Sequence, residues 1–140
     1  MFATACSSGG EPPSPCTNCN ELSHDFGAYQ LDVAKEIDGV CMSWTLDNAE
    51  ELWVNSVSTD NDGYFHHSNW FWVPEQQFAL PDGHWNCGDN GFDELTAAVF
   101  GGVLYAQSTQ TDSETQQFLP GTAIRIPPRS RIIASTHLLN

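Results

Sequence analysis

The sequence has 140 residues, of which 40% are hydrophobic and 11% aromatic, and it carries a formal net charge of −14. This length predicts one compact domain with a short appendage, and the apolar content excludes a disordered acidic tail. The negative charge excludes nucleic acid as a partner, because a phosphate backbone is bound by basic surfaces. No apolar run approaches the roughly 20 residues of a membrane-spanning helix, so we expect no transmembrane segment.

Residues 1–38 are expected to form a tether and lead-in rather than part of the folded core. The first 20 are rich in Ser, Gly, Pro, Cys and Asn, a composition typical of linkers, and a short helix is predicted over Ala28–Glu36. Small residues before Cys6 and a Ser/Gly stretch after it are similar to the end of a bacterial lipoprotein signal. We therefore expect export to the periplasm, cell surface or medium, with a lipid anchor at Cys6.

The cysteine count agrees with an oxidising compartment. The chain has five cysteines, so a lipidated Cys6 would leave four, an even number that suits disulfides. Cys16 and Cys19 are spaced like a metal knuckle or redox motif, but no second such pair follows. A local disulfide or a linker feature explains them more simply, and whether they pair with each other stays open.

From residue 39 onward the sequence alternates short apolar runs with turn residues. Little helical periodicity is present, apart from one helical turn expected at Phe92–Ala98. Many short strands separated by Gly and Pro turns predict an all-β, antiparallel sandwich. The expected strands and apolar runs are Val40–Leu46, Leu52–Val57, Tyr64–Val73, Val99–Ala106, Thr122–Ile126 and Arg131–Leu139.

Two adjacent histidines, His66 and His67, interrupt the aromatic strand. Successive side chains of a regular strand point to opposite faces. If both imidazoles bind one ion, the strand must bulge, or the two rings must coordinate through different nitrogens. Otherwise, one ring is buried and hydrogen-bonded while the other faces solvent.

A third histidine, His137, lies on the last apolar strand, and a sandwich fold can bring such distant strands together. Three imidazoles with an open position suit copper or zinc, and copper binds more tightly in the Irving–Williams order. His24 and His84 lie in polar, loop-like contexts and are weaker candidates.

Several short motifs follow one another after residue 39. They are Cys41-Met42-Ser43, His66-His67, Trp85-Asn86-Cys87, Leu104-Tyr105-Ala106, Leu119-Pro120-Gly121, Arg125 and His137. In this order and spacing, residues 39–140 resemble the copper type II, ascorbate-dependent monooxygenases, the family that includes peptidylglycine α-hydroxylating and dopamine β-monooxygenases. The resemblance implies a jelly-roll sandwich in which His66, His67 and His137 hold the electron-transfer copper. It also implies a Cys41–Cys87 disulfide.

The same resemblance implies the amino-terminal half of an enzyme that hydroxylates C–H bonds with O2, taking electrons from ascorbate. The family's second sandwich binds the oxygen-activating copper and a small-molecule or peptide substrate, and the sequence ends at Asn140 without it. We therefore expect a fragment or an early-ending member of the family that holds copper without turnover of its own. Ser135 and Gly39 also depart from the family pattern, in which a Gln and an aromatic residue are frequent at those positions.

The charge is divided unevenly along the chain. Every carboxylate lies at or before Glu114, which gives the first 114 residues a net charge of −17 and the last 26 a net charge of +3. The acidic part would favour capture of a cation. Arg125, Arg129 and Arg131 flank the strand of His137, and they are the residues expected to receive the ascorbate anion.

Two other functions remain open. One is a copper-binding or carrier module without catalytic turnover, which would use the same three ligands. The other is a metal-free sandwich that binds carbohydrate on a platform of Trp70, Trp72 and Trp85. Zinc in the three-histidine site would give a hydrolytic or structural role instead.

Overall fold

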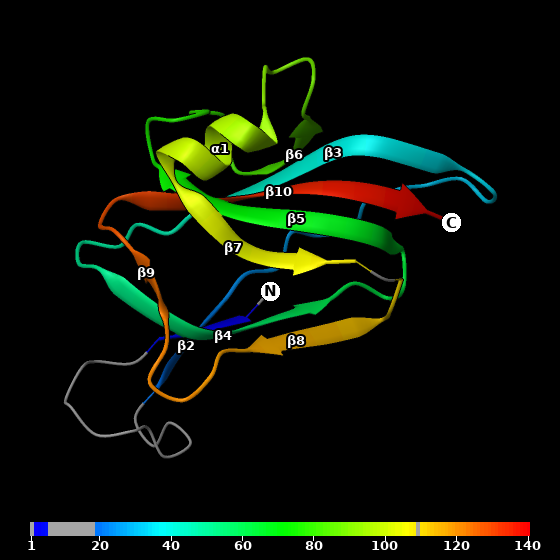
Figure 1. Ribbon diagram of the computed structural model, residues 1–140. Helices are drawn as coiled ribbons and strands as arrows, with labels where there is room; N and C mark the ends of the chain where they lie inside the picture. Colours follow the sequence, from blue (N-terminus) through cyan, green and yellow to red (C-terminus); the bar gives the residue numbers. More distant parts are fainter. Residues whose placement is uncertain (1, 6–18, 109) are drawn as a thin grey trace.

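The computed structural model describes residues 2–5, 19–108 and 110–140, and its strands form two antiparallel sheets in two layers (Figure 1). Sheet 1 has the order β2-β1-β4-β8, with β9 also paired to β4. Sheet 2 has the order β6-β3-β10-β5-β7. The predicted all-β sandwich is confirmed, whereas the finer jelly-roll topology stays a prediction.

Each sheet combines strands from both halves of the chain. Sheet 1 contains β1 (Phe2–Ala5), β2 (Asn20–Ser23), β4 (Leu52–Asp60), β8 (Ser113–Gln117) and β9 (Ile124–Ile126). Sheet 2 contains β3 (Glu36–Thr45), β5 (Phe65–Pro74), β6 (Gly83–Asn86), β7 (Gly102–Gln107) and β10 (Ser130–Leu139). The helix α1 (Glu94–Phe100) lies between β6 and β7 in the chain.

The main core fills the space between the two sheets. Inward-facing side chains of the two sheets fill it, and the usual alternation is interrupted in β4, where Asn55 is an extra residue opposite β1. Val54 and Val57 enter from sheet 1, while Trp70 and Ile132 enter from sheet 2. This core fixes β5 and β10 side by side, with Ile132 opposite Trp72 and Ala134 opposite Trp70.

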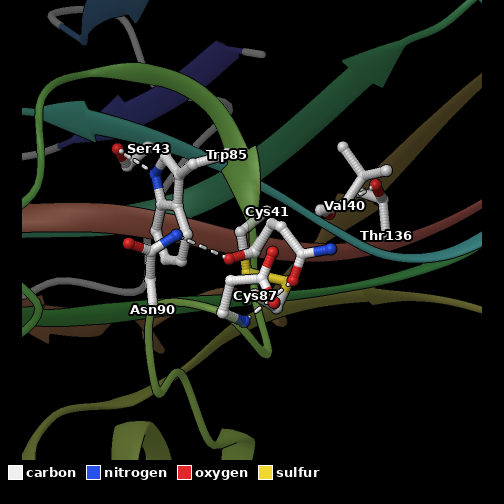
Figure 2. Close-up of a disulfide and its surroundings, with 9 residues drawn as sticks. Val40, Cys41, Ser43, Trp85, Cys87, Asn90 and Thr136 are labelled. Carbon is white, nitrogen blue, oxygen red and sulfur yellow. Dashed lines mark hydrogen bonds between the residues drawn. A yellow bond between two sulfur atoms is a disulfide. The ribbon is translucent and has the colours of Figure 1, made fainter.

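A smaller core covers part of the outer face of sheet 2. It contains Phe71, Ile133 and the Cys41–Cys87 disulfide, which confirms the expected pairing of these cysteines. Figure 2 shows this disulfide beside Trp85, whose indole nitrogen donates a hydrogen bond to the Ser43 hydroxyl at 3.0 Å. Helix α1 packs against this face through Ala97, the buried residue of the helix. Its first turn is capped by the Asp93 carboxylate, which accepts from the Thr96 backbone N–H at 2.7 Å.

The helix expected at Ala28–Glu36 does not form. Residues 24–35 lack regular structure apart from a turn, and Glu36 already belongs to β3. Gly27 and Ala34 have positive φ values of 73° and 57°, which a right-handed helix excludes. In contrast, α1 lies where the sequence predicted a helical turn. Across the described residues, no helix is long and apolar enough to cross a membrane.

Candidate metal centre

The three histidines predicted as ligands meet at one end of sheet 2, where β10 ends next to β5 (Figure 1). His137 of β10 is directly opposite His67 of β5 in the antiparallel register. The ring centres are 4.8 Å apart for His67 and His137, 5.1 Å for His66 and His137, and 5.6 Å for His66 and His67. The structure therefore brings all three imidazoles together.

A β-bulge at His66 makes this convergence possible. His137 pairs with His67 and the next residue, Leu138, pairs with Phe65, which leaves His66 as an extra residue in β5. An extra residue interrupts the alternation of faces, so that two successive side chains can approach the same neighbour. For both histidines to bind one ion, we expected either a bulge or coordination through different ring nitrogens, and β5 has a bulge at this position.

A second bulge lies on the other side of His137. Thr136 pairs with Val40 and His137 pairs with Asp38, so Gly39 is the extra residue in β3. Gly39 has a φ of 77°, a conformation that glycine adopts without steric cost. His137 is thus the residue of β10 at which both neighbouring strands are irregular.

Both ring nitrogens of His137 have a partner. Nδ1 lies 3.0 Å from Nε2 of His67, and Nε2 lies 2.6 Å from Oε1 of Glu36. The side chain of His137 is 16% exposed, whereas His66 and His67 are exposed residues. The sequence analysis missed Glu36, which lies 101 residues before its histidine and belongs to no motif.

The spacing of the rings can be compared with a three-imidazole metal site. With metal–nitrogen bonds of about 2.0–2.1 Å in tetrahedral geometry, the ring centres would be about 5.2 Å apart and the ligand nitrogens about 3.3 Å apart. The three observed ring-centre distances, 4.8, 5.1 and 5.6 Å, lie on both sides of the expected ring-centre distance. The 3.0 Å between Nε2 of His67 and Nδ1 of His137 is close to the expected distance between ligand nitrogens. The donor set therefore fits copper or zinc in composition and in spacing.

The fit is not that of a preformed cage. In residues 2–5, 19–108 and 110–140, no group of three or more His, Cys, Asp or Glu side chains could hold a metal ion as the side chains stand. The nitrogens of His67 and His137 are hydrogen-bonded to each other, so a metal ion would have to replace this bond with two coordinate bonds.

The outer face of sheet 2 is covered only in part, which leaves this end open. In Figure 1, α1 lies over the other half of the face, toward the start of β10. Asn69, two residues after His67, donates to the Glu94 carboxylate of α1 at 3.1 Å and marks the border of the covered region. The imidazoles are thus held by a rigid sheet and remain accessible from solvent.

His24 and His84 lie elsewhere, at a cavity of about 720 Å³ that is also lined by Tyr64 and Leu138. His24 stacks on Trp44 with ring centres 5.0 Å apart, and His84 lies 5.3 Å from the ring of Tyr29. Burial lowers the pKa of both imidazoles below the ordinary histidine value. These two histidines are therefore packing residues whose neutral form is favoured by the fold.

The lowered pKa values predict a loss of stability in mild acid. A histidine that binds its proton less readily when folded contributes stability above its unfolded pKa of about 6.5, and this contribution disappears as the pH falls through the folded pKa. We expect the free energy of unfolding to fall between about pH 7 and pH 5. In a His24→Phe, His84→Phe variant, which keeps two aromatic rings, the decrease should be smaller. Urea unfolding at pH 7 and at pH 5 measures the decrease in each protein. Equal decreases in the wild type and the variant would contradict the assignment of the effect to His24 and His84.

The three arginines expected to receive ascorbate are separated by the fold, and each is paired with a different carboxylate. Arg125 binds Glu51 at 2.7 Å and Arg129 binds Glu75 at 2.6 Å. The side chain of Arg131 is 2% exposed and contacts Asp82 at 2.9 Å, the Ser43 hydroxyl and the Phe78 carbonyl oxygen. An anion would have to compete with these partners.

The length of β10 separates Arg131 from the candidate metal centre. Arg131 and His137 lie near opposite ends of the strand, and six residues at about 3.4 Å each separate them by about 20 Å. An anion bound at Arg131 would therefore lie at the other end of the strand from His137.

The tryptophans do not form the exposed platform that carbohydrate binding would need. Trp70 is 2% exposed and belongs to the main core, and its indole nitrogen donates to the Ser68 hydroxyl at 2.9 Å. Trp72 packs against the same core, and Trp85 packs against the disulfide region.

Cys6 and Cys16 lie outside the described residues, and Cys19 is disulfide-bonded.

Comparison with known proteins adds no relative. The chain matches no family model, no curated protein and no solved structure. The proposed function therefore rests on the arrangement of His66, His67 and His137 and on the sequence motifs.

Proposed function

We propose that the chain is a copper-binding module in which His66, His67 and His137 hold one copper ion at the open end of sheet 2. The observation that carries this proposal is the convergence of the three imidazoles, which depends on the bulge at His66. Imidazole nitrogens suit copper, zinc, iron and nickel, and copper is the tightest binder among the divalent ions of this series.

The activity proposed with this site is that of the electron-transfer half of a copper type II, ascorbate-dependent monooxygenase. Copper would supply one-electron redox chemistry at the site. The three imidazoles supply uncharged donors on rigid strands, and the exposure of His66 and His67 leaves a side of the site open to a reductant. The strongly acidic chain would raise the local concentration of the cation. Ascorbate as reductant, and a substrate bound by a second sandwich, come from the sequence resemblance.

A copper carrier without turnover is the second candidate. The exposure of two of the three ligands favours it, because an accessible site can release copper to another protein. For either function, the Cys41–Cys87 disulfide supports an oxidising compartment and therefore export.

Copper titration of the purified metal-free chain tests the proposal. Electron paramagnetic resonance should show one nitrogen-coordinated Cu²⁺ per chain. His67→Ala and His137→Ala should each weaken binding at least about 100-fold, which is more than the loss of a residue that merely supports a ligand. Zinc competition should leave copper bound, as the Irving–Williams order requires.

His24→Ala is the matched control, because it removes an imidazole that lies outside the site. Its copper affinity should equal that of the wild type. Unchanged affinity in His67→Ala and His137→Ala would exclude the assignment. Ascorbate reduction of the loaded chain, followed by transfer of copper to an acceptor chelator, distinguishes a redox site from a carrier.

A further inference from the structure

A carboxylate supports one of the proposed ligands. Oε1 of Glu36 lies 2.6 Å from Nε2 of His137, at the short end of the range for hydrogen bonds to ionised groups. Glu36 is the first residue of β3, and its register partner is Leu139, two residues beyond His137 on β10. The side chain of Glu36 therefore reaches along the strand to meet the imidazole.

The hydrogen-bond partners determine where the proton of a neutral His137 lies. An ionised carboxylate can only accept, so Nε2 of His137 carries the hydrogen that is donated to Glu36. Nδ1 then has a lone pair, which accepts from the Nε2–H of His67 at 3.0 Å. The lone pair of Nδ1 thus faces the other two imidazoles.

We infer that Glu36 is a positioning residue that holds His137 in the Nε2–H tautomer and makes Nδ1 its metal-binding atom. This inference rests on the proposed copper site. A carboxylate hydrogen-bonded to the remote nitrogen of a ligand histidine fixes the ring and makes its free nitrogen a stronger donor. The stronger donor favours Cu²⁺ over Cu⁺, because the more highly charged ion gains more from donor basicity.

Asp38 provides a matched comparison on the same strand. It lies opposite His137 in the register, is exposed and has the same charge, but it has no hydrogen bond to an imidazole among the described residues. If negative charge alone raised the copper affinity, both Glu36 and Asp38 would contribute to it. If the hydrogen bond to His137 raises the affinity, only Glu36 contributes.

The variants Glu36→Gln and Asp38→Asn separate these effects. Glu36→Gln keeps the shape of the side chain and removes its charge at an exposed position, so we expect the fold to be retained, as circular dichroism will show. Its Cu²⁺ affinity should fall about 10–100-fold, with a smaller loss of Cu⁺ affinity. Each tenfold difference between the two losses raises the reduction potential by about 59 mV. Asp38→Asn should retain the affinity and potential of the wild type within about twofold.

The tautomer can be measured without any metal. Two-bond ¹H–¹⁵N correlation spectra of the metal-free wild type at neutral pH should assign the His137 proton to Nε2. A proton on Nδ1, or equal copper binding by Glu36→Gln and the wild type, would overturn the inference. If the wild type binds no copper, the proposed function fails, while the tautomer still decides whether Glu36 orients His137.

Discussion

Removal of the Cys41–Cys87 disulfide is expected to lower the free energy of unfolding by about 4 kcal/mol. The bond joins residues 46 positions apart, and a loop of this length sets that value through the entropy of the unfolded chain. Both cysteines are buried beside Phe71 and Ile133, on the outer face of sheet 2. Loss of the bond would also leave the segment after β6 held to β3 by noncovalent contacts such as the hydrogen bond from the Cys87 backbone N–H to the Gly39 carbonyl oxygen.

Chemical denaturation of the wild type and of a Cys41→Ala, Cys87→Ala variant measures this effect. Reductant should destabilise the wild type strongly. The effect of reductant on the double variant measures the contribution of the Cys19 disulfide alone. Comparison of the double variant with and without reductant therefore serves as the control. A difference below about 1 kcal/mol between the oxidised proteins would contradict the prediction.

Gly101→Ala is expected to destabilise the protein by at least about 3 kcal/mol. Gly101 ends α1 where the helix meets β5, and its backbone N–H donates to the Ala97 carbonyl oxygen at 2.9 Å. A Cβ atom at this position would overlap the Trp72 carbonyl oxygen and lie 2.9 Å from the Val73 Cα. Backbone atoms of a central strand cannot move aside, so the helix would have to leave the sheet.

Gly88→Ala is the control for this substitution, because its added Cβ would have its nearest contact at an ordinary 3.6 Å, to the Asn86 side chain. We expect its stability to change by less than about 1 kcal/mol. Thermal and urea unfolding of the two variants compare the sites directly. Similar midpoints for Gly101→Ala and the wild type would mean that α1 does not pack on β5 as described.

The strands that line the main core could be predicted from the sequence, because burial on one face leaves a visible alternation. The edge strand β7 overlaps the predicted apolar run Val99–Ala106, but the edge strands β8 and β6 could not be predicted. β8 is the polar segment Ser113–Gln117, and β6 has only four residues after a turn. Their pairing with β4 and β3 comes from the register of those neighbours. Local sequence contains no signal for it.

The candidate site divides in the same way. The residue types and the strand context indicated His66, His67 and His137, and the geometry of a strand called for either a bulge or coordination through different ring nitrogens. Glu36 could not be found, because its contact depends on which residue of β3 pairs with which residue of β10.

Gly39 in β3 and His66 in β5 are the extra residues on the two strands beside His137. The geometry of the site therefore depends on the number of residues in these strands as well as on which residues they contain. Deletion of Gly39 or His66 would restore regular pairing in its strand. The residues of that strand on one side of the deletion would then point to the opposite face of the sheet. Deletion of Gly39 would redirect Glu36 without substituting any residue of the site. In an alignment of related chains, a conserved set of site residues would therefore indicate a conserved site only where the one-residue offsets in β3 and β5 are also kept.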